Sequence, residues 1–181
     1  MANGRKVSTT ITYVGEQGAR MALAAAAVAD QLDMEPSEIA KILKRLEPFA
    51  GRMQILSGIK ESMIIDDTYN ASPVAVTAGL DVLYAATTKQ RIAILGSMNE
   101  LGEYSQEAHE IVGAYCDPKK LHLIVTIGAD AKKHLARVAK NQVCKVLSFD
   151  DTYSAGEHVK TVLKKGAVIL AEGSQNGVFA E

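Results

Sequence analysis

The sequence lacks the short motifs by which a phosphate-binding or hydrolytic enzyme is usually identified. It contains no G-x-x-x-x-G-K-[ST] phosphate loop, no G-x-G-x-x-G dinucleotide turn and no G-x-S-x-G nucleophile elbow. Its four histidines are scattered and form no metal-binding pair, so each is expected at the surface. They are His109, His122, His134 and His158. The residues alone therefore predict neither a catalytic group nor a metal centre.

Cysteine is scarce, and neither charge is in clear excess. The two cysteines, Cys116 and Cys144, have no metal-binding spacing, which favours free buried thiols in a reducing cytosol. A net charge of −1 and an isoelectric point near 6.4 give no electrostatic case for nucleic acid or a membrane surface as partner. The start, M-A-N-G-R-K, lacks the apolar core of a signal peptide, and the most apolar run, residues 21–29, is too short to cross a bilayer. We expect a cytoplasmic protein.

The composition is that of an ordinary globular protein, and 181 residues suffice for one domain or for one domain plus part of another. The first block is expected to hold a β-branched strand at 7–13, a turn at Gly15 and Gly18, an alanine-rich helix at 19–32 and a second helix from Glu35 to about Leu46. Such a block is too small to bury a core of its own. We therefore expect it to be the tail of a larger domain.

From Gly51 onward, strands and helices alternate. Strands are expected at 53–56, 62–65, 91–95, 121–127, 143–149 and 167–171, and helices at 73–86, 105–115, 131–139 and 153–163. The first two strands should pair around a turn at Gly58, while near-continuous apolar strands between helices predict a parallel sheet covered on both faces. The predicted fold is a three-layer α/β/α Rossmann-like domain with a mostly parallel sheet. Its strand-end loops should gather on one edge.

The clearest strand end is the stretch S-M-I-I-D-D-T-Y-N-A-S-P, residues 62–73. A buried strand ends in Asp66 and Asp67, and after a polar loop Ser72 and Pro73 are suited to start a helix. Ligands of open α/β sheets bind beyond the carboxyl ends of the strands, so residues 66–70 lie where a ligand would be met. The alternative is that these residues only build a turn and cap the helix, and the pattern alone favours neither.

An acid pair after a buried strand also occurs in phospho-acceptor receiver domains, where it holds Mg²⁺. Those domains need a further aspartate after a middle strand and a lysine after a late one. Here Gly96 and Ser97 follow the middle strand and Glu172 follows the late one. The receiver interpretation therefore fails.

Several motifs occur together in one order over residues 51–181: G-R-M, I-I-D-D-T-Y-N-A-S-P, L-G-S-M-N-E-L-G-E, then His109, then G-S-Q-N before the terminal Glu181. In this order they resemble the Mur ligases, whose typical patterns are D-D-S-Y-N-A-N-P and L-G-x-M-x-E-L-G. The most similar branch adds D-alanyl-D-alanine to a UDP-N-acetylmuramoyl (UDP-MurNAc) tripeptide in peptidoglycan synthesis. Residues 7–46 likewise resemble the end of the family's central ATPase domain.

The resemblance implies that residues 1–47 are a remnant of the central ATPase domain and residues 48–181 the C-terminal domain. The family uses ATP to convert a carboxylate into an acyl phosphate, which an amine attacks to form an amide. The C-terminal domain closes over the nucleotide and orients the amino substrate. The implied partners are ATP, a UDP-MurNAc-peptide, D-Ala-D-Ala and the rest of the central domain, which would hold most of the Mg²⁺ ligands.

Four residues are implied near the nucleotide by their positions in the motifs. Arg52 would reach the ATP phosphates, for which a forked guanidinium is suited. Asp67 would accept hydrogen bonds from the ribose hydroxyls. Tyr69 and Asn70 would lie beside the nucleotide, although both could equally build the turn.

Four further residues are implied near the amino substrate. Asn99, Glu100 and His109 belong to the family's second loop, and helix initiation and packing are their alternative roles. Ser174 would bind a substrate carboxylate through its hydroxyl and N–H groups, or would only turn the chain.

The chain also departs from the family pattern. The family's G-x-H-N-x-x-N is replaced by G-E-Q-G-A-R-M, which leaves Gln17, Gly18 and Met21 at positions that lie near the adenine base in the family. The late K-G-S pattern is E-G-S here, with Glu172 in place of the lysine. Because the phosphate loop is missing, we expect no ligase activity from this chain alone. A non-catalytic binding or scaffolding module, and a sibling ligase of the folylpolyglutamate or cyanophycin type, are the alternatives.

Overall fold

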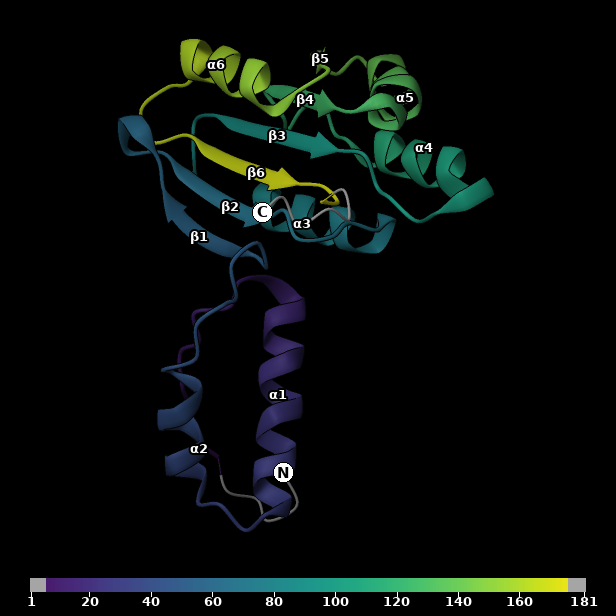
Figure 1. Ribbon diagram of the computed structural model, residues 1–181. Coiled ribbons are helices and arrows are strands. Elements are labelled where there is room, and N and C mark those ends of the chain that lie inside the picture. The colour runs from purple at the N-terminus through teal and green to yellow at the C-terminus, as the bar shows by residue number, and fades with distance from the viewer. Residues whose placement is uncertain (1–5, 176–181) are drawn as a thin grey trace. The chain divides into compact units, whose positions relative to one another are not determined.

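The computed structural model describes residues 6–175, which are divided into two compact units between Phe49 and Ala50 (Figure 1). The first unit contains the helices α1 (Gly15–Gln31) and α2 (Pro36–Leu43). Helix α1 begins four residues before the predicted start, so Gly15 and Gly18 belong to the helix and not to a turn. Gly18 is needed there because a Cβ atom on it would lie 2.6 Å from the Cβ of Tyr13.

The strand predicted at residues 7–13 does not form. Within residues 6–175 no second strand pairs with it, and a strand needs a neighbour for its backbone hydrogen bonds. Its side chains bond to backbone carbonyls instead: Thr9 Oγ1 donates to Ala40 O at 2.9 Å and Tyr13 OH donates to Glu47 O at 2.9 Å. The alternating pattern therefore identified an extended segment but not its pairing.

The second unit is built on a six-stranded sheet in the order β1-β2-β6-β3-β4-β5. Its strands are β1 (Gln54–Ser57), β2 (Met63–Asp67), β3 (Arg91–Gly96), β4 (Leu123–Ile127), β5 (Val146–Phe149) and β6 (Val168–Glu172). β1 pairs with β2 in antiparallel fashion and every other pairing is parallel, as predicted. β2 is longer than expected, because both Asp66 and Asp67 lie inside the strand.

Helices cover both faces of this sheet, which confirms the predicted α/β/α class (Figure 1). One face packs against α3 (Pro73–Ala85), α4 (Ser105–Tyr115) and α5 (Ala136–Asn141), which follows a π-helical turn at Ala131–Leu135. The other face packs against α6 (Thr152–Val162) through Ala155 and Val159, and against Leu163, the residue that caps its C-terminus. Ser72 caps α3 as expected, since its side chain accepts a hydrogen bond from Ala75 N at 3.3 Å.

Among the described residues, no helix has both the length and the apolar character that a membrane crossing requires.

Candidate functional site

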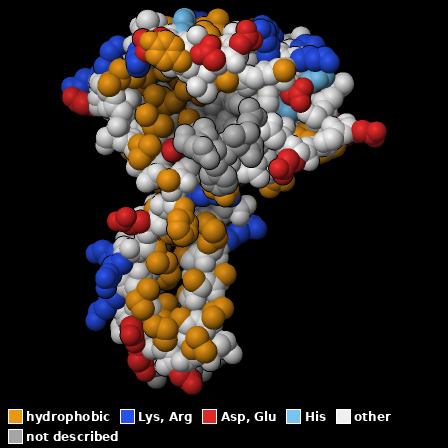
Figure 2. Space-filling view, in the orientation of Figure 1, with side chains coloured by type: hydrophobic (Ala, Val, Ile, Leu, Met, Phe, Trp, Pro, Cys, Tyr) orange, Lys and Arg blue, Asp and Glu red, His pale blue; other side chains and the backbone are white. Residues whose placement is uncertain are grey.

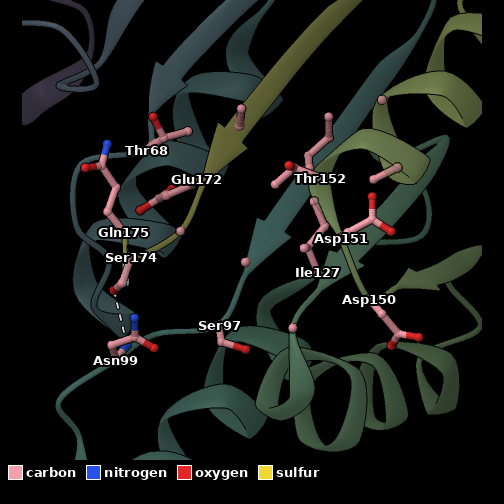
Figure 3. A pocket seen from close by; sticks show the side chains of 17 residues that line it. Thr68, Ser97, Asn99, Ile127, Asp150, Asp151, Thr152, Glu172, Ser174 and Gln175 are labelled. Carbon is pink, nitrogen blue, oxygen red and sulfur yellow. Dashed lines mark hydrogen bonds between the residues drawn. The ribbon is translucent and has the colours of Figure 1, made fainter. Parts of the chain in front are cut away.

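The carboxyl ends of the parallel strands surround a cavity of about 650 Å³ (Figure 3). This volume falls in the range of small-molecule sites, roughly 300–1,000 Å³. Every strand-end loop that was expected at this edge contributes to it, and α6 forms one wall. The loop residues include Thr68, Ser97, Asn99, Gly128, Asp150, Asp151, Ser174 and Gln175. The sequence predicted that the strand-end loops gather at this edge but did not predict a wall formed by α6.

The cavity combines an apolar floor with a polar rim. Ile94, Ile127 and Ala171 line it from the sheet, and Ala155 lines it from α6. The rim carries hydroxyl, amide and carboxylate groups, several of which face the opening in Figure 3. Such a surface suits a small ligand that has both polar groups and short aliphatic side chains.

Asp67 lies beside the cavity at the end of β2 and is 8% exposed. Burial raises the pKa of its carboxyl group, while the hydrogen bond from Met53 N and the charge of Arg52 act in the opposite direction. Met53 N donates to Asp67 Oδ1 at 3.2 Å, so the carboxylate holds the segment that carries Arg52. The neighbouring Asp66 supports the loop, because its Oδ1 accepts a hydrogen bond from Thr68 Oγ1 at 2.7 Å.

Arg52 and Tyr69 form an exposed pair next to Asp67. The guanidinium carbon of Arg52 lies 4.1 Å from the centre of the Tyr69 ring, which is a cation–π contact. Gly51 allows this approach: its φ is +67°, and a Cβ atom there would lie 3.1 Å from Tyr69 N. Among the described residues, Arg52 forms no salt bridge, so its guanidinium can receive an anion. The structure thus brings Arg52, Asp67 and Tyr69 together, outside the set of residues that line the cavity.

Glu172 is the neighbour of Asp67 in the parallel register of β2 and β6. It is 3% exposed, and neither carboxyl oxygen has a hydrogen-bond partner within the described part of the chain. Burial, followed by the charge of Asp67, raises the pKa of Glu172 to about 9. The group is therefore a neutral acid at neutral pH. From the sequence, this residue was notable only because Glu172 replaces the lysine of the family's K-G-S pattern.

Ser174 joins three loops through its hydroxyl group. Its Oγ accepts hydrogen bonds from Ala71 N at 3.2 Å and Asn99 N at 3.1 Å, and it donates to Asn70 Oδ1 at 2.9 Å. Its own N–H donates to Ser97 O at 3.1 Å. Asn70, Asn99 and Ser174 are thereby brought together. Binding of a substrate carboxylate by Ser174 stays a prediction, and it would require these bonds to be exchanged.

His109 is fully buried beneath the loop of residues 97–103, so the expectation of a surface position is wrong for it and for the buried His134. Met98 N donates to His109 Nε2 at 3.0 Å, and the ring therefore carries its proton on Nδ1, which donates to Ser105 O at 2.7 Å. The inward face of α4 accounts for the burial. His109 supports the loop, while Glu100 is exposed on it with a φ of +63°. Asn176 and Glu181 of the final motif lie outside the described residues.

Comparisons with known proteins give one consistent result. A family model described as "Mur ligase, glutamate ligase domain" matches residues 51–175. The UDP-N-acetylmuramoyl-tripeptide–D-alanyl-D-alanine ligase of Haemophilus influenzae is 31% identical over 70% of this chain and 27% of its own length. The enzyme of the same name from Synechocystis is 29% identical over 94% of this chain and 37% of its own length.

Solved structures agree with these relatives. A crystal structure of MurF from Acinetobacter baumannii matches with a TM-score of 0.78 and 25% identity, over 92% of this chain and 36% of that one. The MurF ligase from Thermotoga maritima in complex with ADP matches with a TM-score of 0.76 and 26% identity, over 90% of this chain and 36% of that one. The chain thus spans about a third of the length of the proteins that it matches.

Proposed function

The chain belongs to the Mur ligase family, and from this premise we propose that it is the C-terminal part of an ATP-dependent ligase that adds D-alanyl-D-alanine to a UDP-MurNAc tripeptide. Similarity to proteins of that name over most of this chain supports the proposal. The structural observation that carries it is the group formed by Arg52, Tyr69 and Asp67 beside a cavity at the strand-end edge. That arrangement offers one place for a nucleotide and an adjacent place for an amino substrate.

The nucleotide part of the proposal rests on the Arg52 group. The exposed guanidinium, oriented by Tyr69 and free of salt bridges among the described residues, would bind ATP phosphates. Asp67 uses Oδ1 for Met53 N, which leaves Oδ2 to accept ribose hydroxyls. Asn70 would border the nucleotide while its side-chain carbonyl is held by Ser174. ATP would supply the phosphoryl group, and Mg²⁺ would be held mainly by the rest of the enzyme.

The amino-substrate part rests on the cavity. We place D-Ala-D-Ala there, with its methyl groups over the apolar floor and its polar groups toward Asn99 and Ser174. Glu100 presents the exposed side of the same loop, and His109 fixes the loop from below through Met98 N. Because orientation of two reactants lowers the entropic part of a barrier, residues of this kind assist amide formation without touching the acyl phosphate.

We propose that the first unit is the end of a central ATPase domain, as the resemblance of residues 7–46 implies. Its helix α1 buries only Gly18 among its residues and leaves Met21 57% and Leu23 69% exposed. Figure 2 shows hydrophobic side chains gathered along this unit. We propose that the rest of the central domain covers this surface, since exposed apolar patches of this kind mark contact sites. We also propose a cytoplasmic location and no ligase activity for the chain alone, which ADP release from ATP and both substrates would contradict.

A non-catalytic binding module is the second candidate, because an acid occupies position 172 and Gly18 and Met21 occupy positions concerned with the base. Such a module would have kept the fold without binding ATP. Nucleotide binding therefore separates the two functions.

The test is a titration of ATP into the 181-residue chain, followed by NMR. We expect saturable shifts around Arg52 and Tyr69, and a dissociation constant roughly tenfold higher for Arg52→Gln, because charge-assisted hydrogen bonds contribute about 1.5–3 kcal/mol. Arg137→Gln is the matched control, since that exposed arginine pairs with Glu110 at 2.7 Å on another surface. Absence of ATP binding by wild type would favour the module. Equal ATP binding by wild type and Arg52→Gln would contradict the proposed role of Arg52 in holding the phosphates.

A further inference from the structure

The wall that α6 contributes to the cavity contains a glycine that the fold does not require. Gly156 lies inside α6 and lines the cavity. A Cβ atom built on it would meet no heavy atom within 4 Å, and its φ lies outside the left-handed region. Glycine weakens a helix relative to alanine because it loses more backbone freedom on folding. The fold therefore gains nothing from glycine at this position.

The other two glycines in α-helices of the second unit, Gly79 and Gly113, have packing reasons. A Cβ atom on Gly79 would lie 2.5 Å from Glu172 Oε2, and one on Gly113 would lie 2.6 Å from the carbonyl oxygen of Leu135. Neither site could accept a side chain without a shift of its neighbours. Gly156 is different, because the space beside it is open and belongs to the cavity.

The same cavity offers an apolar surface to whatever occupies that space. Ile94 and Ile127 line it from β3 and β4, and the small side chains of Ala155 and Ala171 leave room between them. Figure 3 shows the aliphatic side chain of Ile127 near the α6 wall, with the hydroxyl and amide groups of Ser174 and Asn99 across the opening. An aliphatic side chain would be favoured against these four apolar side chains, because it would replace the water that covers them.

We propose that Gly156 determines how large a side chain the cavity admits on the acyl-accepting dipeptide. The proposal rests on the proposed function, which places that dipeptide in the cavity. The absent Cβ atom leaves space for a branched aliphatic group on the second residue of the dipeptide. Gly156 is thus a specificity-determining residue that selects by size and leaves the polar contacts of the backbone to the opposite rim.

The test compares D-Ala-D-Ala with D-Ala-D-Leu as ligands of the 181-residue chain, by NMR titration of wild type and Gly156→Leu. Wild type is expected to bind both. Gly156→Leu should raise the dissociation constant of D-Ala-D-Leu about tenfold or more, while that of D-Ala-D-Ala changes less than about threefold, since loss of space for one methylene already costs that much in a hydrophobic pocket. Gly156→Ala, which favours the helix, should give an intermediate loss of affinity for D-Ala-D-Leu. It also keeps the test decisive if Gly156→Leu does not fold.

Glu157→Leu is the control, because it places the same side chain on the next, exposed residue of α6, outside the cavity lining. It should bind both dipeptides as wild type does. Three results would overturn the inference and leave the proposed function intact. Gly156→Leu could bind D-Ala-D-Leu as wild type does, or it could lose affinity equally for both dipeptides. Wild type could also bind D-Ala-D-Ala and fail to bind D-Ala-D-Leu. Failure of wild type to bind either dipeptide would overturn both.

Discussion

Two carboxyl groups lie side by side at the ends of β2 and β6, where the strand register pairs Asp67 with Glu172. Both are buried, and only Asp67 receives a hydrogen bond that an anion accepts, from Met53 N. Two adjacent buried carboxylates cannot both be charged at low cost, so the proton stays on Glu172. This arrangement keeps the negative charge on Asp67, which we propose accepts hydrogen bonds from the ribose hydroxyls.

The pH dependence of stability follows from that proton. The folded-state pKa of Glu172 is raised from 4.5 to about 9, so between these values the folded chain holds a proton that the unfolded chain releases. The stability that the group contributes is full below about pH 4.5 and is lost as the pH rises toward 9. We expect the urea midpoint of the second unit to fall from pH 5 to pH 9, and Glu172→Gln to remove most of that fall.

Asp151→Asn is the control for this experiment. Hydrogen bonds from Ser154 lower the pKa of Asp151, so its contribution is lost only as the pH falls below its ordinary range. The Asp151→Asn substitution should leave the fall of the urea midpoint between pH 5 and pH 9 unchanged. If the urea midpoints of wild type and Glu172→Gln changed with pH in parallel, Glu172 would ionise normally.

At the scale of elements, the sequence was sufficient for the parallel sheet and for the edge at which its loops gather. Apolar strands between helices predicted that the strand-end loops share one edge, and Gly96, Gly128 and Gly173, each at or after a strand end, all line the cavity there. The order of the strands was not predicted and comes from the structure. The strand at residues 7–13 could not be judged in the same way, because alternation reports an extended segment and not a partner. The cavity wall at Gly156 could not be predicted from the sequence either, because packing decides which face of α6 borders the cavity.

The three loops that meet at Ser174 give the element-scale prediction. Ser174→Ala removes the acceptor of the Ala71 and Asn99 amides, and each lost hydrogen bond costs about 0.5–1.5 kcal/mol. We expect hydrogen exchange to accelerate roughly three- to tenfold at both amides, although they lie in different loops. Ser72→Ala, which removes only the cap bond to Ala75 N, should leave Asn99 unaffected. Acceleration at one amide alone would mean that Ser174 does not join the loops.

At the scale of the whole molecule, the two units differ in how much they bury. The second unit has fully buried side chains on both faces of its sheet, such as Leu80, Ile92 and Leu170. In the first unit, the two helices bury only Gly18, Ile39 and Leu43 among the residues described. Stability should therefore be unevenly distributed along the chain, because protection from local opening follows buried contacts.

Hydrogen exchange measured by mass spectrometry on the 181-residue chain tests this difference. We expect the amides of α1 and α2 to exchange roughly a hundredfold faster or more than those of β3, β4 and β6. A chain of residues 50–181 should keep the slow exchange of its sheet, since the core clusters of that unit contain no residue from the first. Supplying the rest of the central domain should slow exchange in α1 selectively, because its exposed apolar side chains would then be covered. If α1 is already as protected as β3 in the chain alone, the first unit is stable by itself, and the proposal that it completes a larger ATPase domain loses its physical basis.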